Sequence, residues 1–273
     1  MKYADLHLHT VYSDGSYTPE KLIDEAAKSG LSAISVTEHD SVDSTELVMA
    51  CSRVHGLEAI AGIEFTAEYN DREIHILGYL VDYKNHSLRE KIAVLQQVRT
   101  ERVHHILKKL GALNIALDPS KVFALATKGT VGRLHIAKAL VSEGLVGSTW
   151  EVFDKYLGDK GPAYVAGFRF SVYEAARIIK DAGGIPVLAH PHVLENNDLI
   201  PYFAEQGVMG IEALYSEYSE ETVHFYLQIA QKLNLLVTGG SDFHGDAKPE
   251  VKLGSVKIPY TLVEDLKKAK TRL

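Results

Sequence analysis

The chain has 273 residues, of which 46% are hydrophobic and 24% charged, with eight prolines and a single cysteine. This composition is typical of a globular protein with a substantial core, and it excludes the disordered and fibrous classes. Because Cys51 is the single cysteine, an intramolecular disulfide is excluded. The formal net charge of −7 argues against non-specific binding of nucleic acid but does not exclude a phosphorylated substrate.

The first ten residues interrupt their apolar positions with Asp5, His7 and His9, which excludes the apolar region of a signal peptide. The longest apolar runs, such as residues 185–189, fall far short of the roughly 20 residues that a membrane-spanning helix needs. We therefore expect a cytoplasmic protein without a membrane partner, which the lone thiol also favours.

Short β-like runs alternate with amphipathic helical stretches in both halves of the chain, which predicts βα units. In the first half the predicted strands and helices alternate at residues 3–8, 19–28, 33–37 and 42–54, and further strands follow at 59–63 and 74–80. In the second half they lie at residues 172–180, 185–190, 210–214 and 235–238, and a final helix covers 262–270.

Strand signals disappear between these halves, and residues 88–110 form the longest periodic stretch. We interpret residues 87–161 as an inserted helical subdomain, so that 1–86 and 162–273 form the other domain. The polar face of the long predicted helix is interpreted as a solvated surface rather than a nucleic-acid patch. That face includes Arg99, Glu101, Arg102, Lys108 and Lys109.

The strongest local signal is the run Asp5-Leu6-His7-Leu8-His9. Alternate residues of a strand point to one side about 6–7 Å apart, so both imidazoles can approach one metal ion. Leu6 and Leu8 would face apolar packing on the other side. The same alternation also fits a half-buried strand, so this pair alone leaves both interpretations open.

Further His, Asp and Glu side chains lie at or near the ends of the later predicted strands. They are Asp14, His39, Glu64, His75, His190, Asp242 and His244. One histidine at a strand end is more often a hydrogen-bonded residue than a ligand, but such a recurrence is improbable by chance. Because the carboxyl ends of barrel strands meet at one rim, we expect these side chains to converge there.

In order and approximate spacing, these motifs resemble those of the PHP (polymerase and histidinol phosphatase) superfamily, and the resemblance runs over nearly the full chain. The pattern is HxH with a following SDG, TxHD, a strand Glu, a strand His, AHP and a closing SDxH. Its nine positions are filled by His7, His9, Asp14, His39, Glu64, His75, His190, Asp242 and His244. The resemblance implies an α/β fold, namely a distorted (β/α)7 TIM-like barrel with a trinuclear metal centre at its rim.

The resemblance also implies how the ligands divide among three divalent ions, commonly Mn, Fe or Zn. One ion would be held by His7, His9, Glu64 and Asp242. Glu64 would bridge to a second ion held by His75 and His190, and Asp14, His39 and His244 would hold the third. This mixed nitrogen and oxygen set suits these metals and is unsuited to calcium.

Such a centre would turn water into a hydroxide that attacks phosphorus in line, so that no protein nucleophile is required. The candidates for the acid that protonates the leaving group are His192 and a metal-bound water. Asp40 is expected to orient His39 by accepting its other N–H.

On the substrate side, Arg133 and His135 resemble the R-x-H-I-A element of small bacterial PHP phosphoesterases and could grip a phosphate at a helix start. The alternative is a surface arginine with a capping histidine. Lys160 is a further candidate for substrate binding on a nearby loop. The chain departs from many relatives at Glu38, where they have Asp, and at residues 215–218, where they often have a histidine.

The closest overall resemblance is to the stand-alone group with a helical insert, which includes phosphatases of 3′,5′-bisphosphates and exonucleases of RNA 5′ ends. We therefore expect a metal-dependent phosphoesterase that acts on a nucleotide phosphomonoester or on short oligonucleotide ends, without a stable nucleic-acid complex. The alternatives are a histidinol-phosphate phosphatase and a non-catalytic metal-binding PHP scaffold.

Overall fold

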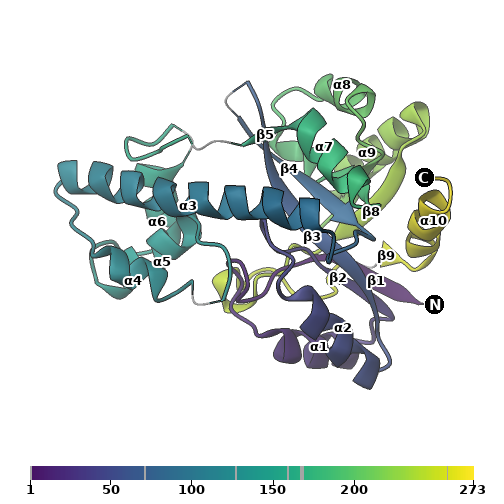
Figure 1. The fold of residues 1–273 in the computed structure, drawn as a ribbon, viewed down its shortest axis with the longest axis horizontal. Coiled ribbons are helices and arrows are strands. Elements are labelled where there is room, and N and C mark those ends of the chain that lie inside the picture. The colour runs from purple at the N-terminus through teal and green to yellow at the C-terminus, as the bar shows by residue number, and fades with distance from the viewer. Residues whose placement is uncertain (1, 71, 127, 159, 167–168, 257) are drawn as a thin grey trace.

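The computed structural model describes residues 2–70, 72–126, 128–158, 160–166, 169–256 and 258–273. The sheet curls towards a barrel with helices packed outside it, and a group of helices extends to one side along a long helix (Figure 1). Both chain termini lie at the opposite side of the molecule from that group.

Within the described residues the sheet has nine strands, in the order β8-β7-β6-β4-β3-β2-β1-β9, and β5 pairs with β3. The strands are β1 (Tyr3–Leu8), β2 (Ala33–Val36), β3 (Glu58–Tyr69), β4 (Arg72–Tyr79), β5 (Phe170–Ser171), β6 (Ile185–Leu188), β7 (Gly210–Tyr215), β8 (Leu236–Gly240) and β9 (Ile258–Pro259). The His9 N–H donates to the Phe243 carbonyl at 3.0 Å, and the Asp242 N–H donates to the His7 carbonyl at 2.9 Å. These bonds join the end of β1 to the segment after β8 and nearly close the barrel.

Two of the described strands run in the opposite direction to their neighbours, namely the short edge strand β9 beside β1 and, within the barrel wall, β4. β4 is antiparallel to both β3 and β6, whereas β1, β2 and β3 pair in parallel, as do β6, β7 and β8. The first residues of β4 therefore lie at the rim where the parallel strands end, and His75 is among them. The expected α/β barrel is confirmed, and this reversed strand distorts it.

Helices with one apolar face cover the outside of the sheet. They are α1 (Pro19–Lys28), α2 (Thr45–Val54), α7 (Val172–Asp181), α8 (Leu199–Glu205), α9 (Glu220–Leu233) and α10 (Thr261–Lys270). In α1 the Thr18 hydroxyl accepts from the Lys21 N–H, and Pro19 occupies the first turn. In α7, Ser171 and Glu174 form a reciprocal capping box.

A second group of helices follows β4 and surrounds a hydrophobic cluster of its own. They are α3 (His86–Ala112), α4 (Pro119–Phe123), α5 (Arg133–Ser142), α6 (Thr149–Val152) and the π-helical turn η1 (Phe153–Leu157). Leu88 and Leu95 in the first half of α3 pack on the barrel core, whereas Val103 and Leu110 in its second half pack against α4, α5 and α6. We propose that residues 87–161 form an inserted subdomain whose first helix is shared with the barrel.

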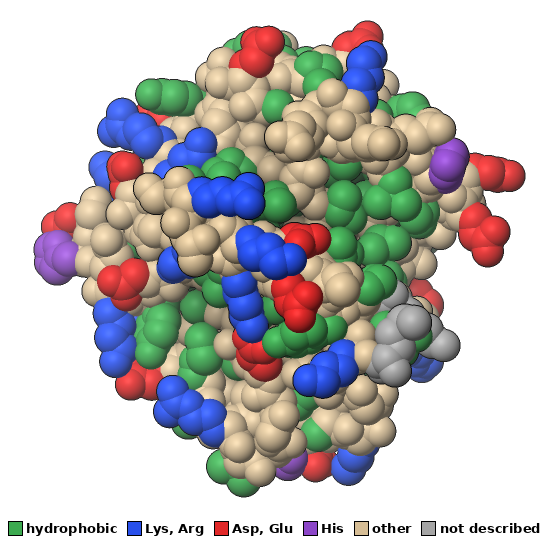
Figure 2. All heavy atoms as spheres, turned by 90° about the vertical axis from the view of Figure 1, so that its right-hand side faces the viewer, with side chains coloured by type: hydrophobic (Ala, Val, Ile, Leu, Met, Phe, Trp, Pro, Cys, Tyr) green, Lys and Arg blue, Asp and Glu red, His purple; other side chains and the backbone are tan. Residues whose placement is uncertain are grey.

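A search for membrane spans among the described residues finds no helix that combines the required length and apolarity. Figure 2 shows the face on the right-hand side of Figure 1, where Lys and Arg side chains are interspersed with acidic ones. This mixture is typical of a solvated surface rather than of a track for nucleic acid.

Candidate metal centre

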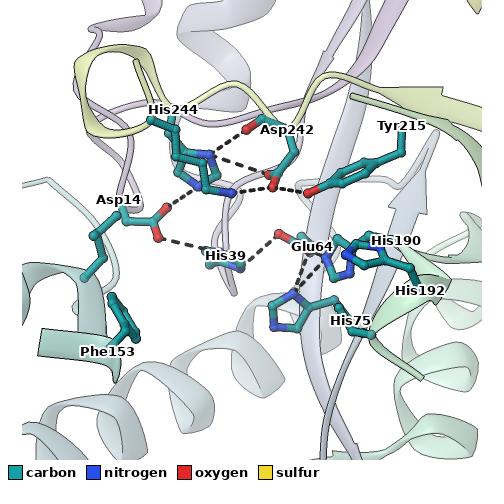
Figure 3. A pocket seen from close by; sticks show the side chains of 13 residues that line it. Asp14, His39, Glu64, His75, Phe153, His190, His192, Tyr215, Asp242 and His244 are labelled. Atoms are coloured by element: carbon teal, nitrogen blue, oxygen red, sulfur yellow. Dashed lines mark hydrogen bonds and ion pairs between the residues drawn. The ribbon is translucent and has the colours of Figure 1, made fainter. Parts of the chain in front are cut away.

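All nine residues of the motif pattern come together at the rim of the barrel. Seven of them line a cavity of about 300 Å³ (Figure 3). His7 and His9 are fully buried and contact Glu64 and Asp242 of that lining. They come from the ends of β1, β2, β6 and β8, from within β3, from the start of β4 and from the turn after β1. The convergence that we expected from strand ends is therefore what the structure shows.

A first group of ligand-type atoms surrounds one oxygen of Glu64. His7 Nε2 lies 3.3 Å from Glu64 Oε2 and 3.4 Å from Asp242 Oδ1. His9 Nε2 lies 3.3 and 3.2 Å from the same two oxygens. Two imidazoles and two carboxylates thus direct four atoms towards one point.

A second group surrounds the other Glu64 oxygen. His75 Nδ1 lies 2.8 Å and His190 Nε2 lies 3.1 Å from Glu64 Oε1, and these two nitrogens are 3.3 Å apart. Glu64, which is only 1% exposed, therefore presents one oxygen to each group.

A third group is centred on Asp14. His244 Nε2 lies 3.1 Å from Asp14 Oδ1, and His39 Nε2 lies 3.7 Å from Asp14 Oδ2. The other ring nitrogen of His39, Nδ1, lies 3.0 Å from Glu64 Oε2, so His39 also reaches the first group.

Several of these buried atoms have no hydrogen-bond partner among the described residues. They are His7 Nε2, His9 Nε2, Asp14 Oδ1, His39 Nδ1 and Glu64 Oε2. Each buried polar atom without a partner costs about 1–3 kcal/mol. Ligand atoms bound at 2.0–2.1 Å in a tetrahedral zinc site lie about 3.3 Å apart, which is the spacing found here. The residues present therefore fit bound divalent metal ions.

Neighbouring carboxylates raise the pKa of two of the buried histidines. Burial by itself lowers the pKa of His9, but the carboxylates of Asp242 and Glu64 outweigh it and raise that pKa to about 9. Against the same effect of burial, the Glu64 carboxylate raises the pKa of His75 to about 10. Burial would raise the pKa of Asp14, but the imidazoles of His244 and His39 hold it well below its usual range. Incoming metal ions must therefore displace protons from this cluster.

Glu212, which sequence reasoning missed, supports two of the histidines at once. Its Oε1 lies 3.0 Å from His7 Nδ1, and its Oε2 accepts the backbone N–H of His190 at 2.8 Å. The side chain is fully buried in β7. A carboxylate in an otherwise apolar strand must find partners, and this signal could have identified Glu212 in the sequence.

Glu38 supports His9 through a serine. The Ser13 hydroxyl lies 3.2 Å from His9 Nδ1 and donates to Glu38 Oε2 at 2.5 Å, and the Thr10 N–H donates to the same oxygen at 3.1 Å. The Glu38 carboxylate thus ties the turn that carries Asp14 to the end of β2.

The expected role of Asp40 is wrong. Its Oδ1 accepts the Thr66 N–H at 2.8 Å and its Oδ2 accepts from Arg99 Nε at 2.6 Å, whereas both ring nitrogens of His39 face Asp14 and Glu64. Asp40 adopts a left-handed backbone conformation with φ 45°, which places its side chain among the residues of β3 and α3. The backbone carbonyl of His39 is held instead by the Thr130 hydroxyl at 2.6 Å.

Two arginines of α3 that we expected on a solvated face are engaged with the barrel instead. Arg99 bonds Asp40 and Thr66, and Arg102 lies 3.5 Å from the Glu73 carboxylate of β4 and donates to the Val165 carbonyl at 2.7 Å. The helical period places these residues on one stripe, but it cannot show that a strand of the barrel covers that stripe.

Glu73 lies behind His75 and is surrounded by guanidinium groups. Its Oε1 lies 3.1 Å from His75 Nε2 and its Oε2 lies 2.6 Å from Arg169 Nη2. Arg102 and Arg133 each approach this carboxylate at 3.5 Å. Glu73 thereby fixes the ring of His75 so that Nδ1 faces Glu64. Sequence reasoning missed both Glu73 and Arg169.

The predicted substrate-binding residues are not brought together in the cavity. Arg133 contacts Glu73 and donates to the Leu157 carbonyl at 3.2 Å. His135 is buried, its Nδ1 accepts the Gly132 N–H at 3.1 Å, and burial lowers its pKa to about 4. This arrangement favours the capping alternative for His135. Lys160 is exposed and does not line the cavity.

Beyond the nine, side chains from both parts of the chain complete the cavity. Phe153 and Leu134 come from the helical group, and His192, Tyr215 and Lys248 come from barrel loops and strand ends (Figure 3). His192 Nδ1 lies 3.2 Å from the Tyr218 hydroxyl, and burial together with His190 lowers the pKa of His192. A lowered pKa does not favour an acid, and the role of His192 stays a prediction.

Comparison with known proteins decides the family. Residues 5–134 match the model of the PHP domain. Over 251 residues the chain is 30% identical to the 3′,5′-nucleoside bisphosphate phosphatase of Chromobacterium violaceum. The aligned region covers 89% of this chain and 88% of that protein. The chain belongs to the PHP family.

Other PHP proteins are similar over most of the chain. The 5′-3′ exoribonuclease Rnm of Escherichia coli is 30% identical over 261 residues, or 92% of this chain and 87% of that protein. The crystal structure of a protein from Bifidobacterium adolescentis, assigned as a metal-dependent phosphoesterase, has a TM-score of 0.90 and 30% identity over 97% of this chain and 95% of that one. With its three groups of ligand-type residues, this PHP protein is a metal-dependent phosphoesterase, as the sequence predicted.

Proposed function

We propose that this PHP protein binds three divalent metal ions and either hydrolyses a phosphomonoester of a nucleotide or cleaves the ends of short oligonucleotides. The observation that carries the proposal is the set of buried, unpartnered nitrogen and oxygen atoms beside a cavity of about 300 Å³. A cavity of that volume lies at the small end of the range for small-molecule sites, which suits one nucleotide better than a duplex.

The three ions would divide the nine residues as the resemblance to PHP proteins implies, with His39 between two groups because its Nε2 lies 3.7 Å from Asp14 Oδ2 and its Nδ1 lies 3.0 Å from Glu64 Oε2. One ion would be held by His7, His9, Glu64 and Asp242, and a second by Glu64, His75 and His190. Asp14, His39 and His244 would hold the third. A ligand set of imidazoles and carboxylates suits Mn, Fe or Zn.

When bound, divalent ions lower the pKa of water and draw charge from the phosphoryl oxygens. The residues of the chain hold the ligand side chains in place for that chemistry. Glu212 orients His7, Ser13 orients His9, and Glu73 orients His75. Phe153 from the helical group covers one side of the cavity and limits the access of bulk water.

Two similarities support a nucleotide substrate. The Chromobacterium violaceum relative is a 3′,5′-nucleoside bisphosphate phosphatase, and the Escherichia coli relative is a 5′-3′ exoribonuclease. Arg133 remains the candidate for binding a second phosphate, although its guanidinium would first have to leave Glu73 and the Leu157 carbonyl. His135 and Lys160 also remain candidates, but their positions support them less.

The test combines elemental analysis of the purified protein with a phosphoester screen, each with and without a chelator. The substrates are a nucleoside 3′,5′-bisphosphate, a short 5′-phosphorylated RNA and histidinol phosphate. We expect about three metal equivalents, and chelator-sensitive phosphate release from the bisphosphate or trimming of the RNA. Activity on histidinol phosphate alone would support the histidinol-phosphate phosphatase. Metal uptake without any hydrolysis would support the scaffold and contradict the proposal.

A further inference from the structure

Lys248 is the one lysine or arginine among the described residues that line the metal-site cavity. It follows the short turn η3 (Gly245–Ala247) in the loop after β8, four residues after His244, the last residue of the closing motif. Apart from the histidines, the other ionisable side chains with a charge at neutral pH in the described lining are the carboxylates of Asp14, Glu64 and Asp242. Lys248 therefore supplies the cavity with a cation that belongs to the chain.

The ammonium group has one anchor and two free protons. Lys248 Nζ lies 2.7 Å from Asp242 Oδ2, and Asp242 is its only hydrogen-bond partner among the described residues. A lysine ammonium carries three protons, so two remain available for another acceptor. The side chain is 33% exposed and lines the cavity, so those protons can be reached from it.

Asp242 does not need a second donor for its own position. The Tyr215 hydroxyl already donates to Asp242 Oδ2 at 2.9 Å, while Oδ1 faces His7 and His9 at 3.4 and 3.2 Å. A neutral hydroxyl fixes that carboxylate without adding charge. Holding a long, flexible lysine beside it costs side-chain entropy and adds a full positive charge that faces the cavity.

We propose that Lys248 is a substrate-contacting residue that binds a non-bridging oxygen of the phosphoryl group and favours phosphomonoesters over phosphodiesters. The ammonium is a point charge that suits phosphate oxygens. A monoester dianion has one more negative charge near this group than a diester monoanion has. The inference rests on the proposed function and narrows its substrate to the class of phosphomonoesters.

The test compares three variants of the metal-loaded protein. Lys248→Met removes the charge and keeps the approximate length, and Lys248→Arg keeps the charge. Lys252→Met is the matched control, because Lys252 lies exposed in the same loop and bonds the Pro249 carbonyl at 3.0 Å. For each variant we would measure kcat/KM for the monoester p-nitrophenyl phosphate and for the diester methyl p-nitrophenyl phosphate. Titration calorimetry gives the affinity for inorganic phosphate, and elemental analysis gives the metal content.

For Lys248→Met we expect a loss of roughly 10- to 100-fold in kcat/KM for the monoester and a similar loss of phosphate affinity, the size typical of a charged hydrogen bond. The diester rate should fall by less than about threefold, because a monoanion interacts less with the missing charge. Lys248→Arg should recover most of the loss, and both Lys252→Met and the metal content should match the wild type.

Equal losses on both esters, or an unchanged affinity for phosphate, would show that Lys248 does not select the phosphoryl group. A metal content that falls in step with activity would mean that Lys248 only positions Asp242, and would overturn the proposal. If the wild type hydrolyses neither these esters nor the nucleotide substrates of the screen, the proposed function fails, whereas the phosphate titration still decides whether Lys248 binds the anion.

Discussion

At the scale of single residues, the buried carboxylate of Glu212 holds two ligand residues from different strands. It contacts the ring of His7 on β1 and the backbone of His190 after β6. Replacing such a supporting group commonly costs 10- to 100-fold in metal affinity. We expect a loss of about that size for Glu212→Gln, because the amide keeps the shape of the side chain and removes its charge.

Competition with a chromophoric chelator measures this affinity. Glu205→Gln is the matched control, since Glu205 lies exposed at the end of α8, away from the cavity. Equal affinities of Glu212→Gln and the wild type would remove Glu212 from the account of the centre.

The raised pKa values of the histidines predict opposite pH dependences for the protein with and without metal. His9 and His75 have pKa values of about 9 and 10 in the folded chain without ions, above the value of about 6.5 in an unfolded one. Their protonated rings stabilise the metal-free fold fully below pH 6.5, and this stability is lost as the pH rises to about 10. Metal affinity should rise over the same interval, because fewer protons must be displaced.

Urea unfolding of chelator-treated protein at several pH values between 6 and 10 checks the first trend, and metal titration checks the second. A metal-free protein that is more stable at pH 9.5 than at pH 6.5 would contradict the raised pKa values of His9 and His75.

The ligand residues could be predicted from the sequence, whereas most of their partners could not. His7 and His9 can be recognised because they alternate with leucines in a predicted strand, and His244 because it ends the SDxH motif. The contacts of Glu212 with His7 and of Glu73 with Arg169 join positions far apart in the chain. Local patterns contain no information about such pairs until the strand order is known.

At the scale of elements, helix α3 connects the helical group to the loop that carries His39. Arg99 of α3 donates to Asp40 at 2.6 Å and also bonds Thr66, and Gln96 donates to the Asp40 carbonyl at 3.1 Å. Asp40 is 1% exposed and Arg99 is 15% exposed, so their ion pair is almost fully buried.

Removing one member of a buried ion pair leaves an uncompensated charge, which costs about 3–5 kcal/mol. We expect Arg99→Met to lower the free energy of unfolding of the metal-free protein by about that amount, measured in urea. Lys108→Met on the exposed side of the same helix should leave it within about 0.5 kcal/mol of the wild type. A similarly small effect of Arg99→Met would show that α3 does not support this loop.

The direction and length of the strands were less predictable than their positions. The sequence predicts strands at 59–63 and 74–80, whereas β3 continues to Tyr69 and β4 begins at Arg72. An alternating pattern identifies a strand but not the direction of its neighbour. The antiparallel pairing of Thr66 with His75 extends both strands and places His75 at the rim.

At the scale of the whole molecule, the barrel and the helical group contribute to one cavity. Ligand-type residues come from the barrel, and Phe153 and Leu134 come from the helical group. The alternation of strands and helices predicted the barrel, and the loss of strand signals predicted the helical segment. The packing of the helical group on the barrel could not be predicted. The apolar stripe of α3 contacts the barrel core with its first half and the cluster of the helical group with its second half, and the sequence does not show where the change occurs.

The most direct test of the metal centre is element-specific anomalous X-ray diffraction from crystals of protein that was purified without chelator. The account predicts three peaks at the barrel rim, each about 2.0–2.3 Å from ligand atoms of one of the three groups around Glu64 and Asp14. A rim without anomalous peaks in metal-replete protein, or ions held by residues outside these groups, would contradict it.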